Sequence, residues 1–267
     1  MLVFSLLICA PARSQNSDAE EQWKRLVMQA LYAASSSHYT DAEAIFVHAM
    51  HEAERFGPED ARVGTTLNSL GLIYRAEKKY SEAETSYHRA LGILEKAYGA
   101  GSIDVANVNF NIATVMFDQN HHQAALPYIQ KAMLSYQGLL GATSLKTASA
   151  LCMLGDAYRI LKSFVDAEEP LRRCADIREK DGGIQNPDLA EAQHSLAMVF
   201  QGQGKLDLAE PRYKLAEKIQ ETTLGITSPV LAQTMDDHAA LLHQMGRDKE
   251  AQKLLTMVAA IRRSQRK

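Results

Sequence analysis

The 267-residue sequence is poor in the residues that interrupt helices and in those that cross-link small domains. It has seven Pro and three Cys, and no Cys-x-x-Cys pair. Few Pro leave long helices intact, and the missing pair excludes the usual zinc-ribbon and thioredoxin-like sites. The charge is almost balanced, at −3 from 29 basic and 32 acidic residues. The composition therefore provides no overall attraction to nucleic acid or to an anionic membrane.

The sequence has no apolar run of the roughly 20 residues that a membrane-spanning helix needs. The run at residues 2–10 instead has the length of a signal-peptide core, and Ala10-Pro11-Ala12 supplies small residues at the spacing of a cleavage site. No Lys or Arg precedes it, so the usual positive start is missing. We predict a signal peptide and short tail over residues 1–16, with export to the periplasm or outside the cell. A cytoplasmic protein is the alternative.

The short motifs of common catalytic sites are also absent, namely HExxH, GxSxG, GxxxxGK[ST] and GxGxxG. Asp118, His121 and His122 cluster at one expected turn, where a solvated loop is a simpler interpretation than a weak metal site. His238 and His243 lie near two Asp, but position 238 is expected to face the core. We predict a protein without catalytic activity, metal or cofactor.

The sequence does contain a repeat with a period of 42 residues. One copy carries the pattern Leu70, Gly71, Tyr74, Tyr80, Ala83, Tyr87 and Ala90. The small residue at position 71 recurs as Ala113, Gly155, Ala197 and Ala239. Small residues let two antiparallel helices approach closely while large ones fill the space around them. Each copy is therefore predicted to be a helix pair.

The predicted fold is all-α and continuous from residue 17 to residue 267. The repeats are expected at about 19–60, 61–102, 103–144, 145–186, 187–228 and 229–267, with second helices that start near residues 40, 81, 123, 165, 207 and 249. Three second helices have the residue spacing of a capping box, in which an N-cap side chain and an acid three residues later bond each other's backbone. These pairs are Thr40 with Glu43, Ser81 with Glu84, and Asp207 with Glu210. They predict where the second helices begin.

The residue pattern resembles the tetratricopeptide repeat, with Leu-Gly, an aromatic residue three positions on, a second aromatic residue, and two Ala seven residues apart. The period of 42 exceeds the usual unit of about 34 residues and, with loops such as 98–104 and 224–230, is similar to the repeats of kinesin light chain. The resemblance covers roughly residues 19–267. It implies a right-handed α-solenoid of about six helix pairs that binds other proteins.

The resemblance also implies where a partner binds. In such arrays the exposed positions of the first helices line a groove that holds a peptide. Here those positions include Asn68, Arg75, Phe110, Phe117, Asp156, Arg159, His194, Met198, Gln201 and His243. We expect the Phe and Met side chains to offer apolar anchors, and Asn68 and Arg159 to bond a peptide backbone or carboxylate. The two Phe have a second interpretation, packing against the adjacent repeat.

Cys152 and Cys174 fall on the first and second helix of one repeat. Helix axes about 8–10 Å apart usually hold Cα atoms beyond disulfide reach, and Cys174 occupies the small-residue position of Ala90. We therefore favour two buried thiols over a disulfide.

Two classes of function remain open. The first is an exported scaffold that holds a peptide or partner protein in the groove. The second is a structural or regulatory subunit that acts through the convex face or the ends of the array, in the cytoplasm if no signal peptide is present. The sequence does not identify the partner or the oligomeric state.

Overall fold

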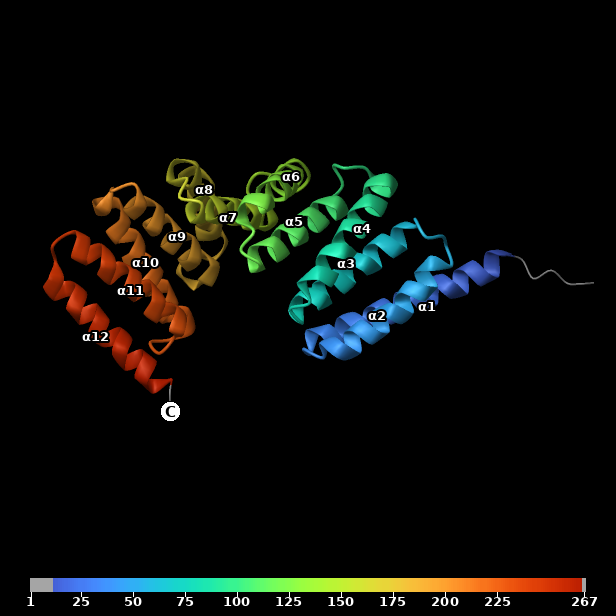
Figure 1. Ribbon diagram of the computed structural model, residues 1–267, viewed down its shortest axis with the longest axis horizontal. Coiled ribbons are helices and arrows are strands. Elements are labelled where there is room, and N and C mark those ends of the chain that lie inside the picture. Colours follow the sequence, from blue (N-terminus) through green and yellow to red (C-terminus); the bar gives the residue numbers. More distant parts are fainter. Residues whose placement is uncertain (1–11, 266–267) are drawn as a thin grey trace, which may run out of the picture. The chain divides into compact units, whose positions relative to one another are not determined.

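The structure is a computed structural model that describes residues 12–265. Within this range it contains twelve α-helices, one short 3₁₀ turn and no strand (Figure 1). This confirms the all-α fold class. Every helix after the first begins within one residue of its predicted start.

The first helix, α1 (Ala12–Ser35), begins earlier than predicted. The end of the segment 1–16, which we expected to be a signal peptide and short tail, is therefore helical from residue 12. The predicted signal sequence itself, at residues 1–11, lies outside the described residues.

The helices group into two compact units, residues 1–120 and 121–267. The first unit contains α1, α2 (Tyr39–Glu54), α3 (Ala61–Ala76), α4 (Tyr80–Tyr98) and α5 (Ile103–Asp118). The second contains α6 (His122–Leu140), α7 (Leu145–Ile160), α8 (Phe164–Gly182), η1 (Gly183–Gln185), α9 (Pro187–Gly202), α10 (Leu206–Leu224), α11 (Pro229–Gln244) and α12 (Asp248–Ser264). The division falls inside the predicted repeat 103–144, between its first helix α5 and its second helix α6.

Consecutive helices pack as pairs at the predicted small residues. Gly71 on α3 faces Tyr87 on α4 so closely that a Cβ atom added to Gly71 would lie 2.5 Å from Tyr87 Cε1. The small residue of each second helix is fully buried in all five copies of the common register: Ala83, Ala125, Ala167, Ala209 and Ala251. In the second unit one apolar cluster runs from Ala148 on α7 to Leu241 on α11. The register predicted from the repeat is confirmed.

The predicted capping boxes are wrong. The three second helices α2, α4 and α10 begin one residue before Thr40, Ser81 and Asp207, and none of their N-caps makes a side-chain hydrogen bond. The reason lies in the preceding turn. Lys78 adopts a left-handed conformation with φ 61°, and the next residue, Lys79, donates its backbone N–H to the carbonyl oxygen of Tyr74. This closes the first helix and makes Lys79 the N-cap of α4.

Two acids of the predicted capping boxes bind the turn of the following repeat instead. Lys79 Nζ donates to Glu43 Oε2 at 2.7 Å, and Arg247 Nη1 donates to Glu210 Oε2 at 2.6 Å. In each case the two partners are 36 or 37 residues apart. The acids therefore hold neighbouring repeats in register.

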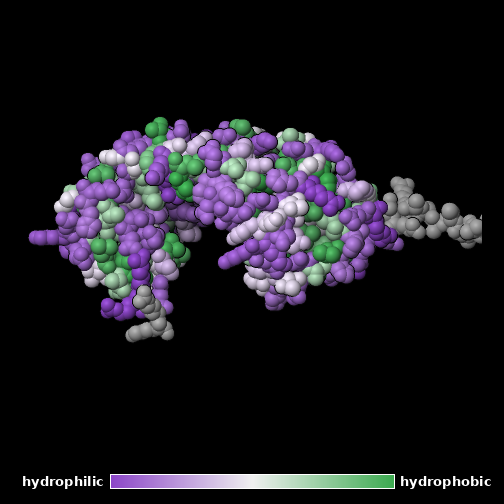
Figure 2. All heavy atoms as spheres, viewed as in Figure 1, coloured by the Kyte–Doolittle hydropathy of each residue, from purple (hydrophilic) through white to green (hydrophobic). Residues whose placement is uncertain are grey.

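Hydrophilic residues cover most of the face shown in Figure 2, with apolar patches between them. Such a surface is expected of helices that bury one apolar stripe. None of the helices within residues 12–265 has the combination of length and apolarity that crossing a bilayer requires.

The close contact at Gly71 predicts that Gly71→Ala destabilises the protein. The added methyl group meets the ring of Tyr87, and overpacking of this kind costs about 1–3 kcal/mol in the free energy of unfolding. Gly92→Ala on α4 is the matched control, because no atom lies within 4 Å of its added Cβ and Ala is favoured over Gly in helices by about 0.5–1 kcal/mol. Urea melts measure both. Equal effects would contradict the register.

The low pKa of the Glu210 carboxyl group predicts that the protein loses stability in acid. Hydrogen bonds from Arg247 and Lys214 lower the pKa of its carboxyl group to about 2, from an ordinary value of 4.5. A carboxyl with a depressed folded-state pKa stabilises the fold above its ordinary pKa, and this contribution is lost as the pH falls toward the folded-state value. The free energy of unfolding should therefore fall less between pH 6 and pH 3 in Glu210→Gln than in the unaltered chain. Glu179→Gln, at an exposed site on α8, is the control. Its free energy of unfolding should fall by as much between pH 6 and pH 3 as that of the unaltered chain.

Candidate functional site

In the first unit, the exposed faces of α3 and α5 are joined by polar pairs 43 residues apart. Asn111 Nδ2 donates to Asn68 Oδ1 at 2.9 Å, and Arg75 Nε donates to Asp118 Oδ2 at 2.6 Å. Two predicted groove residues, Asn68 and Arg75, are thus used to link repeats. The other two predicted groove residues of this unit are half-buried on α5: Phe110 and Phe117.

In the second unit, α9 and α11 are joined by pairs with the same spacing. His194 Nε2 lies 2.9 Å from Asp237 Oδ2, and Gln201 Nε2 donates to Gln244 Oε1 at 3.1 Å. Gln201 Oε1 also accepts a hydrogen bond from the hydroxyl of Tyr213, at 2.8 Å. Burial opposes ionisation of Asp237, but hydrogen bonds from His194 and Gln233 outweigh it and lower the pKa of that carboxyl.

Three further predicted groove residues of the second unit lie together where α7 meets α9. Arg159 Nε donates to Asp156 Oδ1 at 2.9 Å, and Ser195 Oγ donates to the same oxygen at 2.8 Å. Arg159 Nη1 lies 3.5 Å from the sulfur of Met198. The guanidinium is therefore held in place by α7 and α9 before any ligand arrives.

Arg159 and Met198 border a hollow near the C-terminal ends of α7, α9 and α11, which we call the Met198 hollow. Its volume is ≈ 500 Å³. It is lined by Arg159, Ile160, Lys162, Phe164, Met198, Gln201, Gly202, Tyr213, Asp237, Ala240 and Gln244. It combines an apolar wall with two cationic side chains, Arg159 and Lys162, and one acidic side chain, Asp237.

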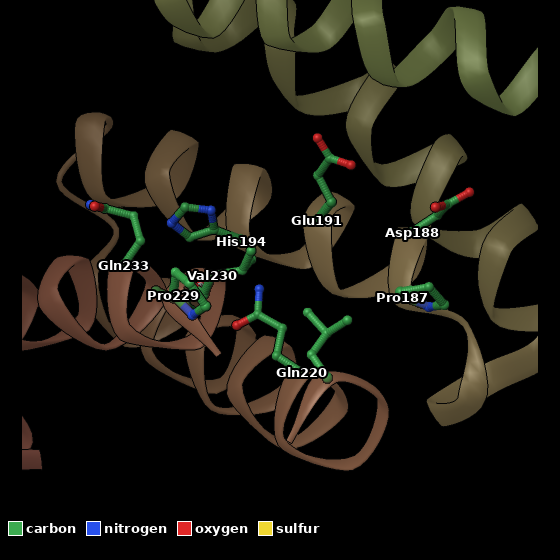
Figure 3. Close-up of a pocket in the computed structure, with 10 residues that line it drawn as sticks. Pro187, Asp188, Glu191, His194, Gln220, Pro229, Val230 and Gln233 are labelled. Carbon is green, nitrogen blue, oxygen red and sulfur yellow. Dashed lines mark hydrogen bonds between the residues drawn. The ribbon is translucent and has the colours of Figure 1, made fainter. Parts of the chain in front are cut away.

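A second hollow lies near the N-terminal ends of α9 and α11, and we call it the Glu191 hollow. Its volume is ≈ 560 Å³. It is lined by Pro187, Asp188, Glu191, His194, Gln220, Leu224, Pro229, Val230, Gln233 and Thr234. Figure 3 shows Gln220 extending from α10 toward His194, with Glu191 and Asp188 on one side and Gln233 on the other.

Of these lining residues, only His194 was among the predicted groove residues. Glu191 and Gln233 follow Thr65, a residue of α3, by three and four periods of 42, so the repeat alone could have found them. Gln220 and Leu224 had no such signal, because they belong to a second helix and only first helices were expected to line the groove.

Two histidines singled out in the sequence have other surroundings. His243 Nδ1 lies 2.6 Å from Asp248 Oδ1, and His243 lines neither the Met198 hollow nor the Glu191 hollow. His238 is 3% exposed, as its position in the repeat predicted, and its Nδ1 lies 2.8 Å from Glu217 Oε1. Within residues 12–265, no group of three or more His, Cys, Asp or Glu could hold a metal ion.

Cys152 and Cys174 form a disulfide between α7 and α8, which contradicts the predicted pair of thiols. Their Cα atoms are 5.5 Å apart, within the normal range for a disulfide. The expectation from helix-axis separation was wrong because α7 and α8 approach closely at Gly155. A Cβ atom added to Gly155 on α7 would meet Leu171 and the backbone of Ala167 on α8.

The profile of the family described as Tetratricopeptide repeat matches residues 62–133, 104–180 and 188–264. The chain belongs to the tetratricopeptide repeat family. Tetratricopeptide proteins are generally non-catalytic scaffolds that bind protein or peptide partners. The family assignment made from the residue pattern is confirmed.

Individual proteins are similar at low identity. Protein KINESIN LIGHT CHAIN-RELATED 2 of Arabidopsis thaliana is 23% identical over 198 residues, covering 73% of this chain and 30% of that protein. The chain spans less than a third of the length of the curated relatives it matches. Among solved structures, BtubC (BKLC) from P. vanneervenii has 20% identity and a TM-score of 0.66, covering 80% of this chain and 92% of that one. YrrB, described as a TPR protein with an unusual peptide-binding site, has 17% identity and a TM-score of 0.56, again covering 80% and 92%.

The disulfide predicts a redox-dependent stability. It closes a loop with a sequence separation of 22, and a loop of this length stabilises the fold by about 3 kcal/mol. A reductant should lower the free energy of unfolding of the unaltered chain by about this amount, and should have no effect on the double variant Cys152→Ser, Cys174→Ala. Unfolding by urea with and without dithiothreitol measures the difference. Equal sensitivity of both chains would contradict the bond.

Proposed function

We propose that this protein is a non-catalytic scaffold that binds an extended segment of a partner protein along the exposed faces of α7, α9 and α11. The observation that carries the proposal is the pair of hollows on this surface, of ≈ 560 and ≈ 500 Å³. Pockets that bind small molecules usually have volumes of about 300–1,000 Å³. Each hollow is therefore large enough to accept one or two side chains of a bound segment.

The Met198 hollow has the chemistry of an anchor site. Phe164, Ile160 and Met198 supply an apolar wall, and the charged lining residues are Arg159, Lys162 and Asp237. Apolar side chains dominate the energy of such contacts, while placed charges orient the ligand. Because Arg159 is already held by Asp156, it needs little reordering to bind. The peptide-binding site described for YrrB is a precedent for a similar fold.

A second candidate function is a structural or regulatory subunit that binds through the start of the array. The observation that favours it is the exposure of large apolar side chains on α1, with Met28 67% exposed and Tyr32 76% exposed. Both line a further hollow of ≈ 670 Å³ between α1 and α2. Exposed apolar patches commonly mark contact sites.

We also propose that the protein works in an oxidising compartment after export. The disulfide between α7 and α8 supports this, because such bonds persist mainly in secreted or periplasmic proteins. The apolar run at residues 2–10 is the other support.

Ala240→Trp tests the binding surface. Ala240 is exposed on α11 and lines the Met198 hollow, so a bulky ring there should fill the space that a ligand would occupy. Ala259→Trp makes the same change at an exposed site on α12 that lines neither hollow. Partners are captured from the native source with the full chain as bait. We expect Ala240→Trp to weaken capture by about tenfold or more and Ala259→Trp to leave it unchanged.

Thermal unfolding of both variants checks that the fold is intact. If a well-folded Ala240→Trp chain captures the same partners as strongly as the unaltered chain, the groove is not the binding surface. Loss of capture in Met28→Ser, Tyr32→Ser would then support the second candidate.

A further inference from the structure

Glu191 differs from the neighbouring acids because no basic side chain forms an ion pair with it. Asp188, next to it in the Glu191 hollow, lies 2.9 Å from Arg178 Nη1. Asp156 is paired with Arg159. Within the side chains that the structure describes, Glu191 makes no hydrogen bond and no ion pair.

The surroundings of Glu191 disfavour its negative charge. Its side chain is exposed to solvent along one wall of the hollow. Burial, followed by repulsion from Asp156 and Asp188, raises the pKa of the Glu191 carboxyl, while His194 and Arg178 oppose this more weakly. A positive charge placed here would relieve both the desolvation and the repulsion.

Gln220 is an independent sign of a missing ligand. It lines the same hollow and is only 3% exposed. Its amide oxygen is enclosed and has no hydrogen-bond partner within the described part of the chain. Buried polar groups in folded proteins are nearly always hydrogen-bonded, and an exception needs an explanation. Figure 3 shows that the Gln220 side chain points into the hollow.

The two helix N-termini at the hollow do not favour an anion. Asn186 caps α9 by accepting the backbone N–H of Asp188, and Ser228 caps α11 by accepting that of Val230. The first residue of each helix is Pro, which has no N–H to offer. The donors that usually bind phosphate or carboxylate at a helix start are therefore reduced in number, and the uncompensated charge in the hollow is that of Glu191.

We propose that the Glu191 hollow receives a basic side chain, Arg or Lys, from the bound partner segment. The charged group pairs with Glu191, the aliphatic stem packs against Leu224 and Val230, and the amide of Gln220 hydrogen-bonds the part of the segment that fills the hollow. Charge complementarity selects this occupant, because the Glu191 carboxylate is unpaired, and Leu224, Pro229 and Val230 supply apolar surface for the stem of a long basic side chain. The inference rests on the proposed function and adds the chemistry of the ligand.

Peptide display tests the inference on the full chain. A library of random ten-residue peptides is selected on the unaltered chain, on Glu191→Gln, and on Glu221→Gln. Glu221 is the matched control, an exposed acid on α10 that does not line the hollow. We expect peptides selected on the unaltered chain to share one basic position. Replacing that residue by norleucine should weaken binding about tenfold on the unaltered chain and on Glu221→Gln, and less than about twofold on Glu191→Gln.

The outcomes separate the inference from the proposed function. Peptides whose binding is blocked by Ala240→Trp but that share no basic position, or that lose equal affinity to norleucine on Glu191→Gln, overturn the basic-side-chain inference and leave groove binding in place. If no peptide binds, or if binding is unaffected by Ala240→Trp, groove binding fails and the inference fails with it. Circular dichroism of each variant confirms that the chains compared are folded.

Discussion

The close approach of paired helices at small residues is the constraint on which the other features of this protein depend. Gly71 lies against the ring of Tyr87, and Gly155 lies against Leu171 and the backbone beyond it. A residue this tightly enclosed cannot rotate away from the interface, so it fixes which face of each first helix is buried and which is exposed. The same closeness brings Cys152 within disulfide distance of Cys174. Helix pairing therefore sets both the cross-link and the surface that the first helices expose.

Neighbouring repeats are then held in register by two sets of polar contacts. On the exposed faces of the first helices, partners are 43 residues apart, as in Arg75 with Asp118. At the turns they are 35 to 37 residues apart, as in Gln119 with Glu84 and Lys205 with Glu168. Many polar side chains on the first helices thus bond to the next repeat. The exposure of such a side chain therefore does not show that it contacts a ligand. The residues that remain for a ligand are those with an unused charge or an unfilled hydrogen bond.

Much of the fold could be predicted from the sequence because the repeat identifies equivalent positions in every copy. A buried small residue must recur wherever two helices touch, and this is why the helix starts and the burial of His238 were predicted correctly. The capping boxes failed because the spacing of Ser81 and Glu84 cannot reveal that Lys78 turns left-handed and moves the helix start. Gln220 could not be found because its role depends on three helices meeting, which a period along one chain does not describe.

Glu191 and Gln220, which line the proposed binding site, depart from the rules that stabilise the rest of the fold. Glu210, an acid that joins two repeats of the same unit, has both Arg247 and Lys214 within hydrogen-bond distance. An unpaired carboxylate and a buried, unmatched amide in one hollow make the free protein less stable than a fully paired alternative. Groups whose surroundings disfavour their charge are concentrated at functional sites in native proteins. In a repeat array each copy contacts mainly its neighbours, so a loss of stability in one copy stays local. One copy can therefore keep the unpaired groups of the proposed site while the other copies hold the fold together.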